Sequence, residues 1–290
     1  MEGRGDRIMI ESKKIKEYAK KLGGDVAGVA DLALLKGIKT KPSNLLDGYT
    51  RAVSVGKRYD DGIFDMIEET RIPSTAYAVN SRNLNIHLDM IAEHLVDHIK
   101  GEGYKAHAIP CSQSAQMAAK LTPDLFESGT DDSFDWEPFT SSDLPNKAVA
   151  RAAGLGWFGK HMLMINPKLG PTFRLVSIIT NMPLDPDKPL DKQKCGKCTL
   201  CVDACPTNAI KGISFDGIPP ALNEILDLPR CRDLLWKKYA VKSDIRLPIC
   251  GVCLSVCPWR KKSLRHLIGK ALFGWVPANI VTSLPKFIWA

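Results

Sequence analysis

The chain has 290 residues, of which 44% are hydrophobic and 25% are charged, and this balance is typical of a folded protein rather than a disordered one. Its formal net charge of +8 favours polyanions such as RNA or an acidic protein surface, although charge alone selects neither. We expect no transmembrane segment, because Pro277 and Pro285 interrupt the most apolar stretch, 271–289.

Residues 1–21 are charged throughout and lack the apolar core of a signal peptide. The chain contains nine cysteines, and cysteines in a chain without a secretion signal more often bind metals than form disulfides. We therefore expect a cytoplasmic protein whose cysteines ligate metal. Nothing in the sequence indicates an oligomeric state.

The first 180 or so residues alternate between helical and strand patterns. Apolar residues at helical spacing are followed by glycines that end the helix, and short runs rich in β-branched residues predict strands between them. Helices interleaved with strands indicate an α/β or α+β domain. The predicted elements are helices over 10–22 and 85–100 and strands over 51–59, 105–110 and 173–181.

Residues 121–145 differ from their surroundings, because acidic residues stand among Ser, Thr, Pro and aromatic residues and no period is sustained. We expect a long surface loop. Such loops are often lids or binding loops, and a solvated insertion without function is the alternative. A short helix is expected to follow over 146–153.

Eight of the nine cysteines lie between residues 195 and 257, after the Pro-rich, charged segment 183–194, which is typical of a linker. The tail beyond the last cysteines is basic and apolar. It suits RNA phosphates, an anionic membrane or an acidic partner, or it packs on the protein as a basic helix. We therefore expect an α/β domain over 1–185, a ferredoxin-like domain over 186–262 and a basic and apolar tail over 263–290.

The first cysteine run is Cys195-x2-Cys198-x2-Cys201-x3-Cys205, followed by proline. This is the spacing of bacterial ferredoxins, in which three cysteines bind one [4Fe–4S] cluster and the fourth binds a neighbouring cluster. Zinc sites use paired Cys-x2-Cys or Cys/His units instead. The run therefore predicts iron–sulfur clusters rather than zinc.

The second run, Cys250-x2-Cys253-x3-Cys257, has only three cysteines, so a second cluster needs a fourth ligand. Cys231 is the one unassigned cysteine nearby. The reciprocal rule of two-cluster ferredoxins then completes both sites. One cluster is assigned Cys195, Cys198, Cys201 and Cys257, and the other Cys205, Cys231, Cys250 and Cys253.

Residues 154–165 read GLGWFGKHMLMI, GPTFRLVSIITNMPL follows from Gly170, and the two cysteine runs come next. This order resembles the epoxyqueuosine reductase family, cobalamin-dependent iron–sulfur enzymes related to reductive dehalogenases. The resemblance extends from about residue 8 to residue 260. Family members usually continue well past the second cysteine run, so the chain resembles a short paralogue.

The resemblance implies an α/β domain that cradles cobalamin without an axial ligand from the protein, and a cluster domain that passes electrons to cobalt. In the reductase, reduced cobalt and a protonating aspartate remove the epoxide oxygen from epoxyqueuosine in tRNA. The resemblance thus implies an enzyme of queuosine biosynthesis that has an external low-potential electron donor and tRNA as partners. An electron-transfer or corrinoid-activating protein without a tRNA substrate is the alternative, and a reductase of another small molecule is a third possibility.

The resemblance also implies cofactor-binding residues. Gly154, Gly156 and Trp157 match the glycine-rich turn of the family, where small residues let the backbone approach a bulky cofactor. A simple helix–strand turn is the alternative. Lys160 and Arg174 match basic positions that suit the phosphate or amides of cobalamin, and ordinary surface charges explain them nearly as well.

Two further residues come from the resemblance. Ser112 follows Cys111 where the family has a Pro-Ala-Ser turn, and Asp143 resembles the catalytic aspartate, although it lies a few residues closer to the glycine-rich turn. Lys147 aligns instead with a His-Lys pair of paralogues of uncertain substrate. An aspartate beside an apolar cofactor is a suitable proton donor, and a cap or loop residue before the helix 146–153 is the alternative for Asp143.

Overall fold

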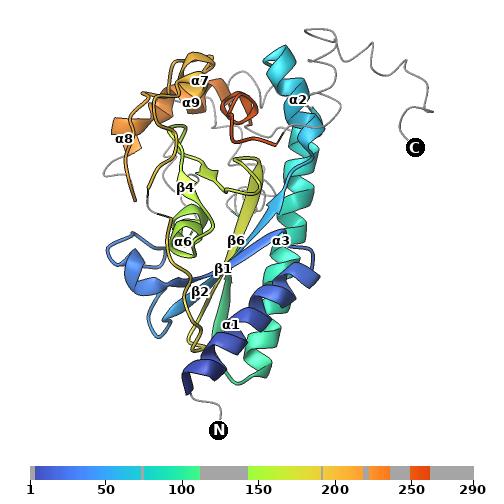
Figure 1. The fold of residues 1–290 in the computed structure, drawn as a ribbon, viewed down its shortest axis with the longest axis vertical. Coiled ribbons are helices and arrows are strands. Elements are labelled where there is room, and N and C mark those ends of the chain that lie inside the picture. Colours follow the sequence, from blue (N-terminus) through green and yellow to red (C-terminus); the bar gives the residue numbers. More distant parts are fainter. Residues whose placement is uncertain are drawn as a thin grey trace, which may run out of the picture.

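The computed structural model describes residues 4–72, 75–111, 143–190, 192–217, 222–235 and 249–261. Its centre is a four-stranded sheet in the order β1-β2-β6-β3 (Figure 1). All neighbouring strands in this sheet are antiparallel, so the expected mixture of helices and strands is confirmed in its α+β form. The strands are β1 (Val26–Asp31), β2 (Arg51–Arg58), β3 (Ala106–Ile109) and β6 (Phe173–Thr180).

Helices α1 (Arg4–Lys21) and α3 (Thr75–Gly101) pack on one face of this sheet. Apolar residues recur every three or four positions along α3, which gives the helix a continuous buried stripe. The strands alternate their side chains between the two faces, and their valines meet that stripe. The resulting core includes Ile15, Val53, Val55, Leu88, Ile91, Leu95, Val176 and Ile178.

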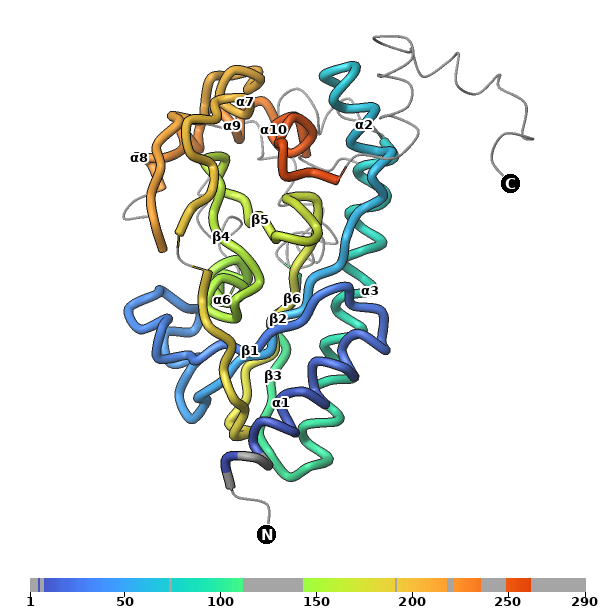
Figure 2. Tube along the Cα trace, in the orientation of Figure 1, coloured from blue at the N-terminus to red at the C-terminus, as the bar shows by residue number. Residues whose placement is uncertain are grey.

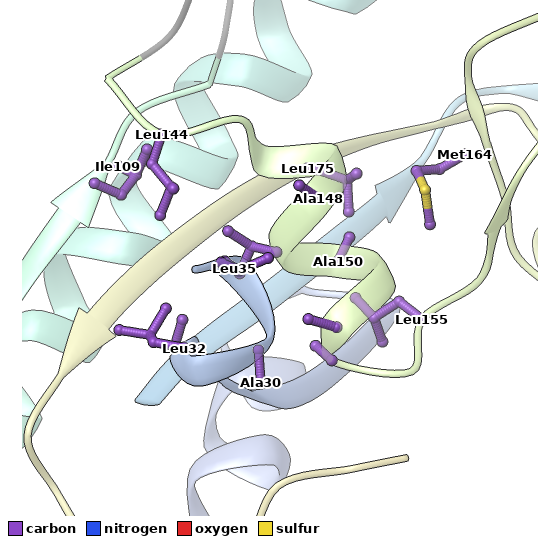
Figure 3. Close-up of a cluster of buried hydrophobic side chains, with 14 of the residues drawn as sticks. Ala30, Leu32, Leu35, Ile109, Leu144, Ala148, Ala150, Leu155, Met164 and Leu175 are labelled. Carbon is purple, nitrogen blue, oxygen red and sulfur yellow. The ribbon is translucent and has the colours of Figure 1, made fainter. Parts of the chain in front are cut away.

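The opposite face of the sheet is covered by α6 (Asn146–Ala152) and the short 3₁₀ helix η1 (Leu32–Leu35), as Figure 3 shows. Helix α6 has alanines at positions 148, 150 and 152, and these small side chains let the helix lie close to the strands. Gly28 in β1 fits the same close packing, because a Cβ atom there would lie 2.2 Å from the Ala153 carbonyl oxygen.

The C-terminal cysteine-rich part lies beyond the hairpin of β4 (Trp157–Phe158) and β5 (Met164–Ile165). Its short helix α10 (Val252–Ser255) packs beside α2 (Asp61–Thr70), which precedes α3 (Figure 2). None of the helices in the described ranges is long and apolar enough to cross a membrane. The short helices of this part are α7 (Leu200–Asp203), α8 (Leu222–Ile225), α9 (Leu228–Asp233) and α10 (Val252–Ser255).

The helices predicted over 10–22, 85–100 and 146–153 correspond to α1, α3 and α6, and the three predicted strands correspond to β2, β3 and β6. Strand β1 was not predicted, because VAGVAD is short and contains Gly and Ala, which have low strand propensity. Most of the acidic loop (residues 121–142) and the tail 263–290 lie outside the described residues.

The segment predicted as a linker, 183–194, is packed against the sheet and its helices at its start. Leu184 is 1% exposed and belongs to the core under α1 and α3. The Asp187 carboxylate accepts hydrogen bonds from Lys16 Nζ and from the Val29 backbone amide, at 2.8 Å and 2.9 Å. These contacts fix the chain along β1 before it enters the cysteine-rich part.

Candidate metal centre and active site

Four cysteines, three from the first run and one from the end of the second, line one cavity of about 110 Å³. Cys195, Cys198 and Cys201 come from the first run, and Cys257 comes from the end of the second. Burial, together with the charges of the neighbouring thiols, raises the pKa of Cys201 to about 11 and that of Cys257 to about 12. Such thiols ionise readily only beside a cation, which is what a bound iron–sulfur cluster supplies.

The other four cysteines form a second group. Burial raises the pKa of Cys231 to about 11, and Cys250 and Cys205 add to the shift. Burial also raises the pKa of Cys253, with further contributions from Cys250 and Cys231. Cys253 also feels the charge of Cys201 from the first group, so the two sets lie close together, and their assignment as separate ligand sets stays a prediction.

The donor set of the two cysteine groups bears on which kind of metal site they form. Among the described residues, no three His, Cys, Asp or Glu side chains converge closely enough to hold a single metal ion. A [4Fe–4S] cube is larger than one ion and separates its four thiolates accordingly. The donor set therefore suits a cluster better than a mononuclear zinc site, which needs four ligands around one atom.

Lys160 supports the first cysteine loop. Its side-chain Nζ donates to the carbonyl oxygens of Gly196 and Cys198, at 2.9 Å and 3.0 Å, and the residue is 6% exposed. Trp157 is 1% exposed and packs edge-on against Trp259, with ring centroids 4.8 Å apart. Both residues named for cofactor binding thus lie against the protein's own cysteine loops.

The glycine-rich turn is shaped by close backbone contacts. Gly154 has a φ of +68°, and a Cβ atom there would lie 2.6 Å from the Lys188 carbonyl oxygen. At Gly156 a Cβ atom would lie 2.2 Å from the carbonyl oxygen of Ile165. Glycine is needed at both positions because backbone segments meet there.

Asp143 is exposed, and its carbonyl oxygen accepts a hydrogen bond from the Lys41 backbone amide at 2.9 Å. The N-cap of α6 is Pro145, without a side-chain capping bond, so Asp143 is a loop residue and not the cap. Leu144 beside it is fully buried and anchors this loop in the core. Ser112 lies outside the described residues.

A group of buried polar side chains lies between α3, α6 and β6. Arg174 Nε donates to Asn85 Oδ1 at 2.8 Å, and Lys147 Nζ donates to the Met162 carbonyl oxygen at 3.0 Å. Burial lowers the pKa of Lys147, and the nearby Arg174 lowers it further. Burial, followed by the charge of Lys147, lowers the pKa of His161 to about 4, so this imidazole is neutral at pH 7.

Aromatic residues connect this polar group to the second set of cysteines. Tyr77 packs edge-on against Tyr59 and Phe64, with centroids 5.3 Å and 4.9 Å apart. Burial raises the pKa of the Tyr77 hydroxyl, which lies near both Arg174 and Cys253.

Sequence reasoning found only part of this group. Arg174 was named from the family resemblance and Lys147 only as an aligned position, whereas Asn85, Tyr77 and His161 were missed. Asn85 and Tyr77 are polar positions within the buried stripe of α3, and that departure from an apolar pattern was the available signal.

Comparison with known proteins agrees with the motifs. Residues 194–260 match the family described as a 4Fe–4S double cluster binding domain. Over 261 residues the chain is 28% identical to an epoxyqueuosine reductase of Leadbetterella byssophila, covering 88% of this chain and 82% of that protein. The resemblance to the epoxyqueuosine reductase family is confirmed.

Solved structures of two kinds share the fold. A reductive dehalogenase whose structure suggests a mechanism for B12-dependent dehalogenation has a TM-score of 0.64 and 18% identity, covering 92% of this chain and 34% of that one. An epoxyqueuosine reductase with an epoxyqueuosine-modified tRNA-Tyr stem loop has a TM-score of 0.51 and 22% identity, covering 91% of this chain and 76% of that one. At these identities the likeness shows the fold alone.

Proposed function

We propose that this protein is an iron–sulfur reductase that holds two [4Fe–4S] clusters and a cobalamin. The observation that carries this proposal is the convergence of Cys257 with Cys195, Cys198 and Cys201 around one cavity, beside a domain that has the fold of B12-dependent and epoxyqueuosine-reducing enzymes. When bound, these groups supply one-electron transfer and reduction of the substrate at cobalt. The ligands proposed for the second cluster are Cys205, Cys231, Cys250 and Cys253.

Orphaned polar atoms support a bound cofactor in the first domain. Within the described ranges, Asn146 Oδ1 and Ser177 Oγ are buried and have no hydrogen-bond partner. Both flank the end of β3, because Asn146 Nδ2 donates to the Pro110 carbonyl oxygen and Ser177 is the register partner of Ile109. Buried polar atoms without partners are costly, and a ligand rich in amides, such as a corrinoid, would satisfy them.

Of the residues expected to bind cobalamin, Arg174 has the clearest support, because its guanidinium lies in the interior and its described partners are uncharged. Lys160 and Trp157 fit a supporting role, in which they hold the cysteine loop in place. Gly154 and Gly156 are proposed to shape the turn on which that loop rests. A binding role for Ser112 is proposed from the resemblance alone.

We propose Asp143 as the residue that protonates the substrate. Its loop is anchored by Leu144, yet its own side chain is exposed, so it is open to an incoming substrate. Asp143→Asn removes the acidic carboxyl group that would donate the proton. It should lower turnover by about 100-fold or more, while cluster content and corrinoid binding stay unchanged. Unchanged turnover would assign the proton to another group.

The first candidate substrate is epoxyqueuosine in tRNA, from the names of the relative and of the tRNA-bound structure. The proposed partners are this tRNA and an external low-potential electron donor, and the proposed compartment is the cytoplasm, where thiols stay reduced. The test is anaerobic turnover of epoxyqueuosine-containing tRNA by protein loaded with clusters and cobalamin, with nucleoside mass spectrometry as the readout. Conversion to queuosine supports this substrate, and its absence in an otherwise reducible holoprotein excludes it.

The second candidate function is electron transfer or activation of another corrinoid protein. It is favoured by the position of Asp143, which is exposed and does not line the described cysteine cavity. In this case the reduced, cluster-loaded protein should pass electrons to an added corrinoid protein at a rate that does not depend on Asp143. The reductase predicts instead that Asp143→Asn stops turnover without slowing electron transfer to bound cobalamin.

A further inference from the structure

His161 contributes an imidazole to the wall of the cavity that the first group of cysteines lines. The residue is 4% exposed, and within the described ranges its Nε2 atom is buried and has no hydrogen-bond partner. Among the described side chains that line this cavity, no other has a buried polar atom without a partner. Buried polar atoms are nearly always satisfied, so this nitrogen indicates a partner other than the described residues.

The backbone determines which nitrogen of this ring carries the proton. His161 Nδ1 accepts a hydrogen bond from the Leu163 backbone amide at 3.1 Å. A ring nitrogen that accepts has no proton of its own, so the proton of the neutral ring lies on Nε2. Nε2 is therefore a donor, and the group that it meets in the cavity has to be an acceptor.

Close packing holds the imidazole in this position. A Cβ atom at residue 159 would lie 2.7 Å from His161 Cε1 and 3.1 Å from Nε2, so the ring occupies space that a glycine leaves open. Backbone hydrogen bonds of 2.9 Å join Gly159 to Leu163 and to Met162, and they close the turn around the ring. The donor is thus positioned by the fold itself, as second-shell groups of metal sites usually are.

The other polar side chains of the cavity wall already have contacts. Lys160 Nζ donates to the carbonyl oxygens of Gly196 and Cys198. Lys194 Nζ lies 5.4 Å from the centre of the Trp157 ring, which is a cation–π contact. The side-chain acceptors available to Nε2 inside the cavity are therefore the cysteine sulfurs and the group that they bind. The remaining lining residues are apolar or aromatic, namely Ile165, Pro258 and Trp259.

We propose that His161 donates a hydrogen bond from Nε2 to a sulfur of the first [4Fe–4S] cluster and thereby raises the reduction potential of that cluster. This rests on the proposed function, because it needs the cluster that Cys195, Cys198, Cys201 and Cys257 would hold. Hydrogen bonds to the sulfurs are among the factors that set the potential of an iron–sulfur cluster. A donor stabilises the reduced form more than the oxidised form, since the reduced form carries the greater negative charge.

The surroundings strengthen such a bond. The imidazole is buried and the cavity wall is largely apolar, so the hydrogen bond is less weakened by water than it would be at the surface. A raised potential lets the first cluster accept an electron from a weaker donor. The alternative is that His161 only stabilises its turn through the bond between Nδ1 and Leu163, and the experiment separates the two roles.

The test compares two substitutions that separate the two nitrogens of the ring. His161→Asn keeps an oxygen near the position of Nδ1, where it can accept from the amide two residues on, but its side chain is too short to reach the position of Nε2. His161→Gln places an amide N–H near the position of Nε2 instead. Each protein is loaded with clusters without corrinoid, and the midpoint potentials of both clusters are measured by redox titration with electron paramagnetic resonance.

We expect His161→Asn to change the ratio of oxidised to reduced first cluster by about tenfold at a fixed potential, in favour of the oxidised form. For one electron this is a fall of about 59 mV in midpoint potential. The second cluster should keep its potential, and His161→Gln should restore most of the loss at the first. His94→Asn, at an exposed position of α3, is the control and should change neither potential.

Pulsed electron paramagnetic resonance of protein with isotope-labelled histidine gives a direct readout. We expect a histidine nitrogen to couple to the reduced first cluster, and we expect this coupling to be lost in His161→Asn. The proposal is wrong if both potentials stay unchanged in His161→Asn, or if His161→Gln lowers the potential equally. Loss of iron from His161→Asn would assign a structural role and overturn the proposal as well.

Failure of this inference can be told apart from failure of the proposed function. Unchanged potentials in cluster-loaded protein contradict the role of His161 alone. A protein that assembles no clusters would overturn the proposed function and this inference with it. Because the potentials are measured without corrinoid, a protein that binds clusters but no corrinoid would contradict the proposed reductase and leave the role of His161 to be decided by the same titration.

Discussion

The guanidinium of Arg260 binds the carboxylate of Asp65 at 2.6 Å, and the two side chains are 0% and 9% exposed. Arg260 also reaches Glu68 through Nη2 at 2.5 Å and donates from Nε to the Ser255 carbonyl oxygen at 2.8 Å. Asp65 and Glu68 belong to α2 of the first domain, whereas Arg260 lies three residues after Cys257 in the cysteine-rich part. This one side chain therefore fastens the cluster-binding region to the domain that it serves.

Arg260→Gln should destabilise the protein strongly, because it removes the buried guanidinium that Asp65 and Glu68 share. Removing one partner of a buried ion pair typically costs about 3–5 kcal/mol. The measurement is chemical unfolding of the cluster-loaded protein. Arg230→Gln is the control, since Arg230 pairs with Asp227 at an exposed site, with 64% of its side chain accessible, and such pairs contribute about 0–1 kcal/mol. Equal effects of the two substitutions would refute the anchoring role.

Gly156→Ala should disrupt the turn that supports the first cysteine loop. The new methyl group would lie 2.2 Å from the Ile165 carbonyl oxygen, so β4 and β5 would have to separate. We expect a loss of about 1–3 kcal/mol in the free energy of unfolding, as in other overpacked sites. Gly101→Ala, where nothing lies within 4 Å of the added atom, should have little effect. A stable Gly156→Ala variant with intact clusters would contradict the packing described here.

Cys231→Ala should remove a ligand of the second cluster only. Iron content should fall from about eight to about four atoms per chain, because each cube holds four. Cys111→Ala is the matched control, since the Cys111 thiol is buried and donates to the Leu175 carbonyl oxygen at 3.2 Å, away from both cysteine groups. If Cys231→Ala retains eight iron atoms, the proposed ligand set is incorrect.

Lys147 should make stability depend on pH in alkaline solution. Its pKa in the folded protein is lowered from the ordinary value of 10.5, first by burial and then by Arg174, so the unfolded chain binds its proton more tightly. The charged Lys147 side chain therefore lowers the free energy of unfolding. This loss is complete below the pKa of Lys147 in the folded protein and disappears as the pH rises from that value through 10.5. Lys147→Met should therefore be more stable than the original protein at pH 7, with a difference that shrinks toward pH 10.5. A difference that stays constant with pH would contradict the lowered pKa.

The elements that sequence analysis predicted are those with a sustained local pattern. The apolar stripe of α3 and the β-branched run of β6 each predict their element from local sequence. The cysteine spacing predicts the two groups because ferredoxin loops are short and local. The polar group could not be derived in this way. Asn85 and Arg174 are 89 residues apart, and only the packing of α3 on β6 brings them together.

The most direct test of the account is the combined analysis of iron, sulfide and corrinoid in one anaerobically reconstituted sample supplied with hydroxocobalamin. We predict about eight iron atoms and one corrinoid per chain, with the corrinoid absorption changing when the clusters are reduced. Eight iron atoms without bound corrinoid would contradict the proposed reductase and leave an electron-transfer protein.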